Sequence, residues 1–297
     1  MRFELGDIDV LVAEQDFEAG GDSYPAGTLL IDMDGVDREL VSDVLSRSRL
    51  QVDSLRNMPD VATHELDLPR LAVFQTWAST QNAGWVRYSL DQAGIPYTLI
   101  SKDRARAGAL RGEFDVILAP HMSPGTSIGG IMGGVDPKWS PLAYETSDQT
   151  PNLGHILSSD DITGGIGFEG MNNIEAFIRT GGTLITLGSA VVIASDSGIL
   201  RGINKIGAGG MNTPGSILTA KITDSSSSLT YGYDEITHVF CGNGPIFSVP
   251  YYDRDLSPMQ FGTKPLEDEN EEESDDGEND EGEEEAEEQN KTNQIRP

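Results

Sequence analysis

Apolar positions between Pro69 and Pro120 follow two periods in turn. Short apolar runs rich in β-branched residues predict buried strands, and apolar residues three and four apart predict helices between them. The strand-like runs are Leu71–Phe74, Tyr97–Ile100 and Phe114–Ala119, and the helical stretches are Asn82–Ala93 and Ala105–Leu110. Strands that alternate with helices indicate βαβ units, and therefore a parallel sheet.

The same alternation returns in the second half of the chain. Ile174, Phe177 and Ile178 lie on one face of a predicted helix, which two glycines end. Thr183–Leu187 is a largely apolar run of the kind found in a strand covered on both faces. An abrupt turn at Gly188 comes next, and then a further helical stretch. Strand, turn and helix in this order have the geometry of a nucleophile elbow.

The N-terminal part predicts short strands and one helix. Residues 1–35 contain alternating apolar positions, among them Phe3–Val12, and predict two or three strands. Asp37–Leu50 predicts an amphipathic helix. Asn57–Leu68 is polar and loop-like, which makes it a candidate boundary. A segment of this size holds little core alone, so we expect it to pack on the strands and helices after Pro69.

The remaining regions are less regular. His121–Thr163 is rich in glycine, proline and serine and has no periodicity, which predicts a long insertion or lid. Ser216–Ile222 and His238–Val249 predict later, antiparallel strands, and the pattern is lost after Pro250. We therefore predict an α/β fold with a mostly parallel sheet. Its parts are a β-rich joining segment with one helix (residues 1–60), the α/β domain (68–250) and a disordered acidic tail (251–297).

The chain is strongly acidic. Its formal net charge is −29 at pH 7, and Glu267–Glu288 hold sixteen acidic residues and no basic one. The residues before this tail are also acidic, which argues against a nucleic-acid partner, because phosphate backbones need clustered Lys and Arg. So charged a tail is expected to be disordered, with weak calcium buffering as the alternative. An acidic surface with few lysines also suits a salty habitat.

Cysteine content and hydropathy exclude further classes. A single cysteine, Cys241, excludes an internal disulfide and a cysteine-rich zinc site, and we expect it to act as a small buried hydrophobe. No apolar run approaches the roughly 18 residues of a membrane span, so no membrane partner is expected. The first ten residues lack the basic and apolar regions of a signal peptide.

Several segments resemble a known family. PRLAVFQTW, GWVRYSLDQAGIPYTLI, RAGALRGEFDVILAP and GGIGFEGMNNIEAFIRTGGTLITLG resemble the C-terminal module of large carboxypeptidase A-type zinc carboxypeptidases, which is similar to a class I glutamine amidotransferase domain. Residues 16–31 resemble the segment that joins the peptidase domain to this module. The resemblance covers Asp16–Val249 and implies a flavodoxin-like three-layer sandwich with helices on both faces of the sheet.

The resemblance also implies partners and a location. It implies a parent protein with an N-terminal zinc peptidase domain, exported to the periplasm or the outside of the cell, of which this chain is a fragment. The implied partners are that peptidase domain or a peptide substrate, and zinc is expected only in the peptidase domain. No cofactor is expected in this chain.

The sequence departs from the family in ways that bear on function. The family's zinc site takes a His and a Glu three residues apart, and none of the four histidines here has a Glu three residues on, so no metal ligand is predicted. These are His64, His121, His155 and His238. The family usually has a histidine before the Leu-x-Tyr-Gly turn, where Ser227 stands, and the acidic tail replaces the final strands.

The predicted elbow poses the main functional question. In a glutamine amidotransferase the elbow residue is a cysteine paired with a histidine. Gly188 aligns with that cysteine, and Ser189 is the next residue. Glycine tolerates the positive φ of such a turn, so the geometry survives without the chemistry. We predict no catalytic residue. Ser189 and His121 remain the candidates, although Leu187–Val191 does not match G-x-S-x-G.

Residues after the predicted strands form a candidate ligand site. Gln75 and Thr76 follow the first strand, His121 follows the third, and Gly188 and Ser189 follow the fourth. Ligands bind at the carboxyl ends of strands in open α/β sheets. We therefore expect these five residues to line one crevice.

Two other patterns carry possible chemistry. Gly165-x-Gly167-x-x-Gly170 fits the dinucleotide fingerprint by its letters, but no strand precedes it, so a flexible start to the helix is favoured. Anion binding by the first N–H groups of that helix is the alternative. Four aromatic residues could line a carbohydrate or peptide site: Trp77, Trp85, Tyr88 and Trp139. Trp85 and Tyr88 share a helix face, which predicts core packing.

We therefore expect a non-catalytic accessory module of a zinc metallocarboxypeptidase-like protein, which aids peptide binding or packs on the peptidase domain. The alternatives are a hydrolase that uses Ser189 or His121, and a pure interaction module. The hydrolase needs a base within hydrogen-bond reach of Ser189. The interaction module needs a large exposed apolar patch on the N-terminal segment.

Overall fold

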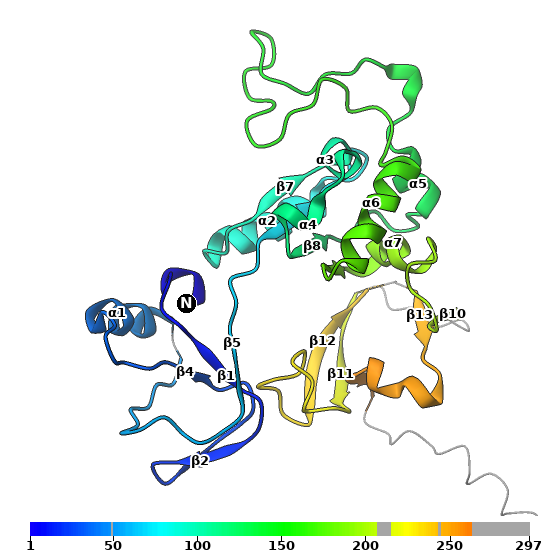
Figure 1. The fold of residues 1–297 in the computed structure, drawn as a ribbon. Coiled ribbons are helices and arrows are strands. Elements are labelled where there is room, and N and C mark those ends of the chain that lie inside the picture. The colour runs from blue at the N-terminus through cyan, green and yellow to red at the C-terminus, as the bar shows by residue number, and fades with distance from the viewer. Residues whose placement is uncertain (49, 207–214, 243–244, 263–297) are drawn as a thin grey trace, which may run out of the picture. The chain divides into compact units, whose positions relative to one another are not determined.

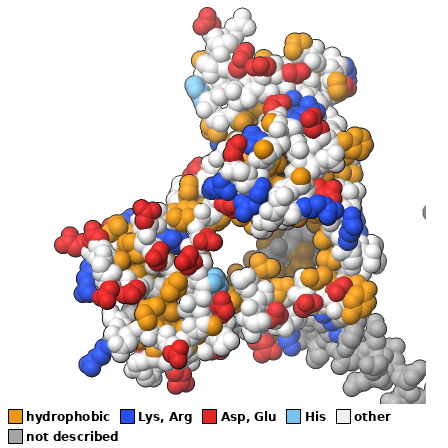
Figure 2. All heavy atoms as spheres, viewed as in Figure 1, with side chains coloured by type: hydrophobic (Ala, Val, Ile, Leu, Met, Phe, Trp, Pro, Cys, Tyr) orange, Lys and Arg blue, Asp and Glu red, His pale blue; other side chains and the backbone are white. Residues whose placement is uncertain are grey.

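The computed structural model describes residues 1–48, 50–206, 215–242 and 245–262 (Figure 1). It is a mixed α/β structure with one four-stranded parallel sheet and several antiparallel sheets. The acidic residues from 267 onward, which the sequence predicts to be disordered, lie outside the described residues. Figure 2 shows acidic side chains at many points on the surface of the N-terminal segment.

The parallel sheet contains the strands that the sequence predicts. They are β6 (Leu71–Phe74), β7 (Thr98–Ile100), β8 (Val116–Ala119) and β9 (Thr183–Thr186), in the spatial order β7-β6-β8-β9. Each neighbouring pair is parallel. The prediction of a parallel sheet built from βαβ units is therefore confirmed for these four strands.

The helices between and after these strands differ widely in length. They are α2 (Gln81–Gln92), α3 (Lys102–Ala107), α4 (Leu110–Glu113), α5 (Ile128–Gly133), α6 (Gly167–Arg179) and α7 (Val192–Ser195). The single helix predicted over Ala105–Leu110 is wrong. Gly108 and Ala109 have φ of 74° and 51°, and a right-handed helix cannot continue through such residues.

The main core lies on one face of the parallel sheet. Phe74 and Ile117 point to that face and pack in one cluster with Ile174 and Phe177 of α6. Ile185 of β9 is 43% exposed on the other face. The interpretation of this strand as covered on both faces is therefore wrong, because a run of four residues does not distinguish one buried face from two.

The N-terminal segment has a small core of its own. Its elements are η1 (Arg2–Glu4), β1 (Leu11–Ala13), β2 (Phe17–Ala19), β3 (Asp22–Tyr24), β4 (Leu29–Leu30), α1 (Arg38–Ser48) and β5 (Thr63–Glu65). Leu5 and Val10 pack with Val41 and Val44 of α1, so the segment holds more core than expected. Phe3–Val12 is not one strand, and the loop predicted over Asn57–Leu68 contains β5, which pairs with β1.

The last described part is antiparallel, as predicted. Its elements are β10 (Asn204–Ile206), β11 (Ser216–Ile222), β12 (Ile236–Cys241), β13 (Ile246–Ser248), η4 (Tyr251–Leu256) and β14 (Met259–Phe261). The sheets have the orders β12-β11-β14 and β10-β13. The predicted strand His238–Val249 is two strands, and β14 comes after the point at which the pattern is lost.

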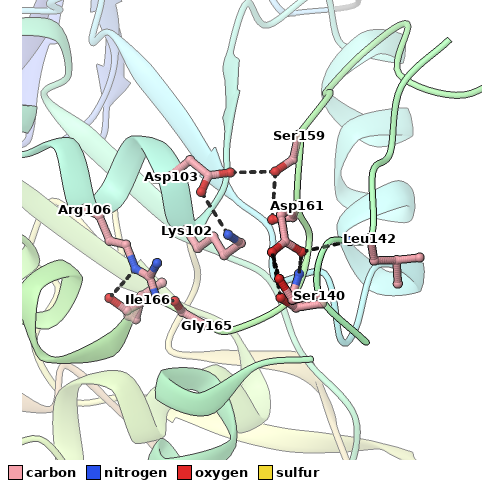
Figure 3. Close-up of polar contacts among 10 residues, drawn as sticks. Lys102, Asp103, Arg106, Ser140, Leu142, Ser159, Asp161, Gly165 and Ile166 are labelled. Carbon is pink, nitrogen blue, oxygen red and sulfur yellow. Dashed lines mark hydrogen bonds and ion pairs between the residues drawn. The ribbon is translucent and has the colours of Figure 1, made fainter. Parts of the chain in front are cut away.

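Polar contacts hold the insertion at 121–163 to itself and to α3 (Figure 3). Besides α5 it contains a 3-10 turn, η2 (Pro137–Trp139), and much irregular chain. Asp161 accepts hydrogen bonds from Ser140 Oγ at 2.7 Å and from the backbone N–H groups of Leu142 and Thr163. These donors, Ser140 first, hold the pKa of Asp161 well below its usual range. Ser159 Oγ donates to Asp103 Oδ2 at 2.9 Å.

Candidate functional site

Neighbouring strands bring the predicted site residues to one end of the sheet. Gln75 and Thr76 directly follow β6, and His121 lies two residues after β8. Gly188 and Ser189 begin the 3-10 turn η3 (Gly188–Val191) after β9. Since β6, β8 and β9 are adjacent and parallel, their carboxyl ends lie together, which is the edge where open α/β sheets bind ligands.

Gly188 makes the turn that the sequence predicts. Its φ is +52°, and a Cβ atom on it would lie 2.4 Å from His121 Nδ1. A side chain here would be strained in the backbone and would also collide with the imidazole. Glycine is therefore required at this elbow, both by its dihedral angle and by the closeness of His121.

The hydroxyl of Ser189 is bonded to backbone on both sides. It donates to Met122 O at 3.0 Å and accepts from Met122 N at 3.1 Å. The side chain is 7% exposed, and His121 Nδ1 lies 3.4 Å from Oγ. The shorter contacts to Met122 occupy the hydroxyl proton and one lone pair. Ser189 thus ties the chain after β8 to the chain after β9.

His121 is positioned by the backbone of the same turn. Its Nδ1 atom accepts a hydrogen bond from the N–H of Ser189 at 3.1 Å. A neutral imidazole that accepts at Nδ1 carries its proton on Nε2, so we assign that tautomer. In this arrangement Nδ1 serves as a structural acceptor, and Nε2–H is the atom that can donate to a ligand.

The loop after β6 is less directly connected to this group. Gln75 is buried and donates its backbone N–H to Ile100 O at 2.9 Å. Ser79 Oγ lies 3.4 Å from Ser123 Oγ, which joins the loops after β6 and β8. The structure therefore brings His121, Gly188 and Ser189 into contact. Among the described residues, no hydrogen bond links Gln75 or Thr76 to those three.

Trp77, one of the four aromatic residues that the sequence singles out, carries a buried polar atom. Its indole Nε1 is buried and has no hydrogen-bond partner among the described residues. Its ring packs on Tyr144 of the insertion, with centroids 5.0 Å apart. An unpaired buried donor costs roughly 1–3 kcal/mol. The position of Trp77, three residues after a strand end, was the signal that could have distinguished it from the other tryptophans.

The other aromatic residues do not join Trp77. Trp85 and Tyr88 form an edge-to-face pair on α2, and Trp85 is 63% exposed, so the prediction that they pack in the core is wrong. The main core excludes α2, which leaves this face of the helix in solvent. Trp139 lies under the ammonium group of Lys138, 5.1 Å from it, and is exposed.

The glycine pattern before α6 serves a close backbone crossing. A Cβ atom on Gly165 would lie 2.2 Å from Ile131 O, so only glycine fits there. Arg106 donates to the carbonyl oxygens of Gly165 and Ile166 (Figure 3). This start of the helix is a tight junction rather than the flexible segment that the sequence favoured.

The amino end of the sheet carries a two-point ion pair. Arg70 Nε and NH2 each lie 2.9 Å from Asp115, to Oδ2 and Oδ1 respectively. The side chain and backbone N–H of Arg70, with Arg111, hold the pKa of Asp115 well below its usual range. This pair joins the starts of β6 and β8, at the end opposite the candidate site, and is therefore structural.

A hollow in the surface lies apart from the candidate site. It measures about 250 Å³ and lies along β7, where Leu99, Arg104, Glu113 and Leu157 line part of it. Arg104 is paired with Glu113 there at 2.8 Å. None of the five predicted ligand residues lines this hollow, so cavity size and strand-end chemistry disagree. Ligands of open α/β sheets bind at the carboxyl ends of the strands, so the strand-end residues rather than this hollow form the candidate site.

The described residues offer neither a metal-binding cluster nor a membrane-spanning helix. They contain no cluster of three or more His, Cys, Asp or Glu side chains arranged to hold a metal ion. In the same part of the chain, no helix combines the length and hydropathy needed to span a bilayer. Cys241 ends β12 and is half-buried, not fully buried as the sequence suggested.

The chain was also compared with known proteins. No protein-family model, no curated protein and no solved structure matches it. Its function is therefore inferred from the geometry of the site and from the residues that carry the sequence resemblance.

Proposed function

We propose that the chain is a non-catalytic accessory module of the amidotransferase-like type, belonging to a zinc metallocarboxypeptidase-like protein. It binds peptide at the carboxyl end of its parallel sheet or packs on the peptidase domain. The observation that carries the proposal is the elbow. By the sequence resemblance, Gly188 aligns with the nucleophile of an amidotransferase, and the hydroxyl of the next residue, Ser189, is hydrogen-bonded to the backbone of Met122. Such a hydroxyl must break its hydrogen bond to Met122 O before a base can take its proton and it can attack a substrate.

The strand order supports the flavodoxin-like class for this module. Numbered along the chain from β6, the observed order β7-β6-β8-β9 is 2-1-3-4. Flavodoxin-like sheets begin with this order, and their ligands bind where the order reverses, between the first and third strands. Here that point lies between β6 and β8, where Thr76 and His121 follow the strands.

Peptide binding is supported by the unpaired donor of Trp77. A peptide carbonyl or a free C-terminal carboxylate would accept a hydrogen bond from the buried indole N–H and remove its desolvation cost. His121 Nε2–H offers a second donor at the same end of the sheet. The chemistry that this edge recognises is thus a hydrogen-bond acceptor, as a peptide backbone supplies.

Packing on a peptidase domain is supported by the open face of the sheet. Ile185 and Leu187 are exposed, although parallel sheets are normally covered on both faces. An apolar domain surface placed over β9 would complete the missing layer.

An experiment on the three indole signals tests peptide binding. The chain has three tryptophans, so its proton–nitrogen NMR spectrum contains three indole N–H signals, assigned with Trp→Phe variants. Short peptides with free carboxylates should shift the Trp77 signal downfield as its N–H gains an acceptor. The exposed Trp85 and Trp139 serve as internal controls and should not move. If Trp77 also stays still at saturating peptide, peptide binding at this edge is wrong.

A hydrolase is the second candidate, because His121 Nδ1 lies 3.4 Å from Ser189 Oγ. Ester and peptide hydrolysis by the purified chain should equal that of buffer, and Ser189→Ala should leave it unchanged. Turnover that Ser189→Ala abolishes, with the fold intact by circular dichroism, would show that the chain is an enzyme.

If the chain is a pure interaction module, its N-terminal segment should expose a large apolar patch. The most exposed large apolar side chain among its described residues is Val52, at 52%. More exposed apolar side chains lie on the antiparallel strands near the C-terminal end.

A further inference from the structure

The sheet β12-β11-β14 carries apolar side chains on its solvent side. Along β12 the exposed positions are Ile236, His238 and Phe240, which alternate with half-buried ones. Phe240 is 77% exposed, and Ile217, directly opposite it on β11, is 73% exposed. A strand with one covered face normally carries polar residues on the other. This face therefore exposes apolar side chains, Ile217 and Phe240 above all, where polar ones are normally found.

β12 is also an edge strand. In the part of the chain that the structure describes, residues 236–240 of β12 pair with β11 along one side and with no strand along the other. Its sequence ITHVFC has no charged residue and no proline, and its register with β11 is unbroken. Charges, prolines and bulges are the devices that keep exposed edges from pairing, and β12 has none of them.

We propose that two copies of the chain pair through β12, as antiparallel strands around a two-fold axis at His238. Two-fold symmetry places the exposed faces of the two copies on the same side of the joined sheet. It allows two registers between the paired β12 strands in which five residues of each strand have a partner. The register centred on His238 aligns Ile236 with Phe240 of the second copy. The register centred on Val239 aligns Phe240 with His238 instead. The strand is thus self-complementary in the first register.

This pairing extends the row of apolar side chains that Ile217 and Phe240 form across two strands of one copy. Ile217 lies opposite Phe240 within one copy. In the dimer, Ile236 of the second copy lies on the other side of Phe240, so three apolar side chains cross three strands. The symmetry produces this row twice. Aromatic and β-branched cross-strand neighbours are the pairs that stabilise antiparallel sheets.

Charge also favours a second copy at this place. Each chain has a net charge of −29, so two copies repel over most of their surfaces. On the solvent face of β11 and β12 the charged side chain is Lys221, and Glu235 lies 3.5 Å from it. Because Lys221 is paired with Glu235 and the face otherwise carries little charge, two acidic chains repel each other least when they meet through this face. The screening length falls from roughly 10 Å at 0.1 M salt to roughly 3 Å at 1 M, so salt should favour the dimer.

The size of the contact predicts a weak dimer. An aromatic side chain buries roughly 150–250 Å². Two copies of Phe240, with the neighbouring isoleucines and the strand edges, therefore bury less than the roughly 1,200 Å² of a standard interface. Contacts of this size are transient, so we expect a dimer that forms and dissociates with protein concentration.

Sedimentation equilibrium of the full chain tests the proposal. The wild type should show a reversible monomer–dimer equilibrium whose dissociation constant is lower at 1 M than at 0.1 M salt. Phe240→Lys should raise the dissociation constant by about 30-fold or more, as loss of a central interface residue does. The matched control is Phe261→Lys, because Phe261 is 61% exposed on β14, the opposite edge of the same sheet. It should leave the constant within about threefold of wild type.

Cross-linking tests the register without depending on affinity. In a Cys241→Ser background, His238→Cys should form a disulfide-linked dimer on mild oxidation, because the two residues face each other across the axis. Thr219→Cys is the control: Thr219 pairs with His238 on β11, so its two copies lie about 14 Å apart across three strand spacings. That distance exceeds the reach of a disulfide, about 7 Å between Cα atoms.

Three results would overturn the proposal. They are a wild-type chain that stays monomeric at every concentration and salt, equal effects of Phe240→Lys and Phe261→Lys, and equal cross-linking at positions 219 and 238. Circular dichroism of each variant confirms that the fold is retained before its association is compared.

Discussion

Replacement of Gly188 by valine tests the elbow on which the functional proposal depends. The residue has φ of +52°, and a Cβ atom would lie 2.4 Å from His121 Nδ1 and 3.2 Å from Cγ. The substitution therefore combines two penalties, a strained backbone and a collision with the imidazole that accepts the N–H of Ser189.

The expected magnitude is the sum of these two contributions. A left-handed backbone costs an ordinary residue roughly 1–2 kcal/mol. Displacement of His121 leaves the N–H of Ser189 without its acceptor, which adds roughly 1–3 kcal/mol if water does not replace it. We expect Gly188→Val to lower the free energy of unfolding by about 2–5 kcal/mol.

Urea unfolding followed by circular dichroism measures this loss, provided that the denaturant slope is unchanged. Gly94→Val is the matched control, because Gly94 has a similar φ of +65° and no atom within 4 Å of its Cβ position. It should lose only the backbone contribution, about 1–2 kcal/mol. If both variants lose the same free energy, the contact between the elbow and His121 does not constrain position 188.

Three other polar side chains give measurable expectations. Ser189→Ala should lower stability by roughly 1–2 kcal/mol in urea unfolding, because it leaves two buried backbone groups unpaired. Asp115→Asn should cost roughly 1–2 kcal/mol at neutral pH. Arg70 lowers the pKa of Asp115 in the folded protein, so this stabilisation is present above the unfolded pKa, near 3.9, and is lost as the pH falls from there toward the folded pKa. The stabilities of the wild type and Asp115→Asn should therefore converge in acid unfolding scans. Asp161→Ala should speed chymotrypsin cleavage within 140–163 several-fold and leave the unfolding midpoint nearly unchanged, because its bonds are local.

Much of the secondary structure could be predicted from local patterns. The strands β6 and β11 were predicted with their observed bounds, and α1 lies within its predicted range. Gly188 was predicted to turn the chain with a positive φ, and it does. These features depend on neighbouring residues, through side-chain periodicity and the steric freedom of glycine, so the sequence carries the information directly.

The shortest elements could not be predicted in this way. β5 and β14 have three residues each, which is too few to show a period, and they form because β1 and β11 offer edges to pair with. The sequence does not say which edges are free, since that depends on residues far apart in the chain.

The tertiary structure also decided what each candidate side chain does. The sequence placed Ser189 and His121 at strand ends, but only the folded structure shows that the hydroxyl of Ser189 is hydrogen-bonded to the backbone of Met122. It likewise exposed Trp85 and left the indole N–H of Trp77 buried and unpaired. Periodicity fixes which way a side chain points along its own element. Whether it meets solvent, core or a hydrogen-bond partner depends on the element packed against it, which a local pattern does not contain.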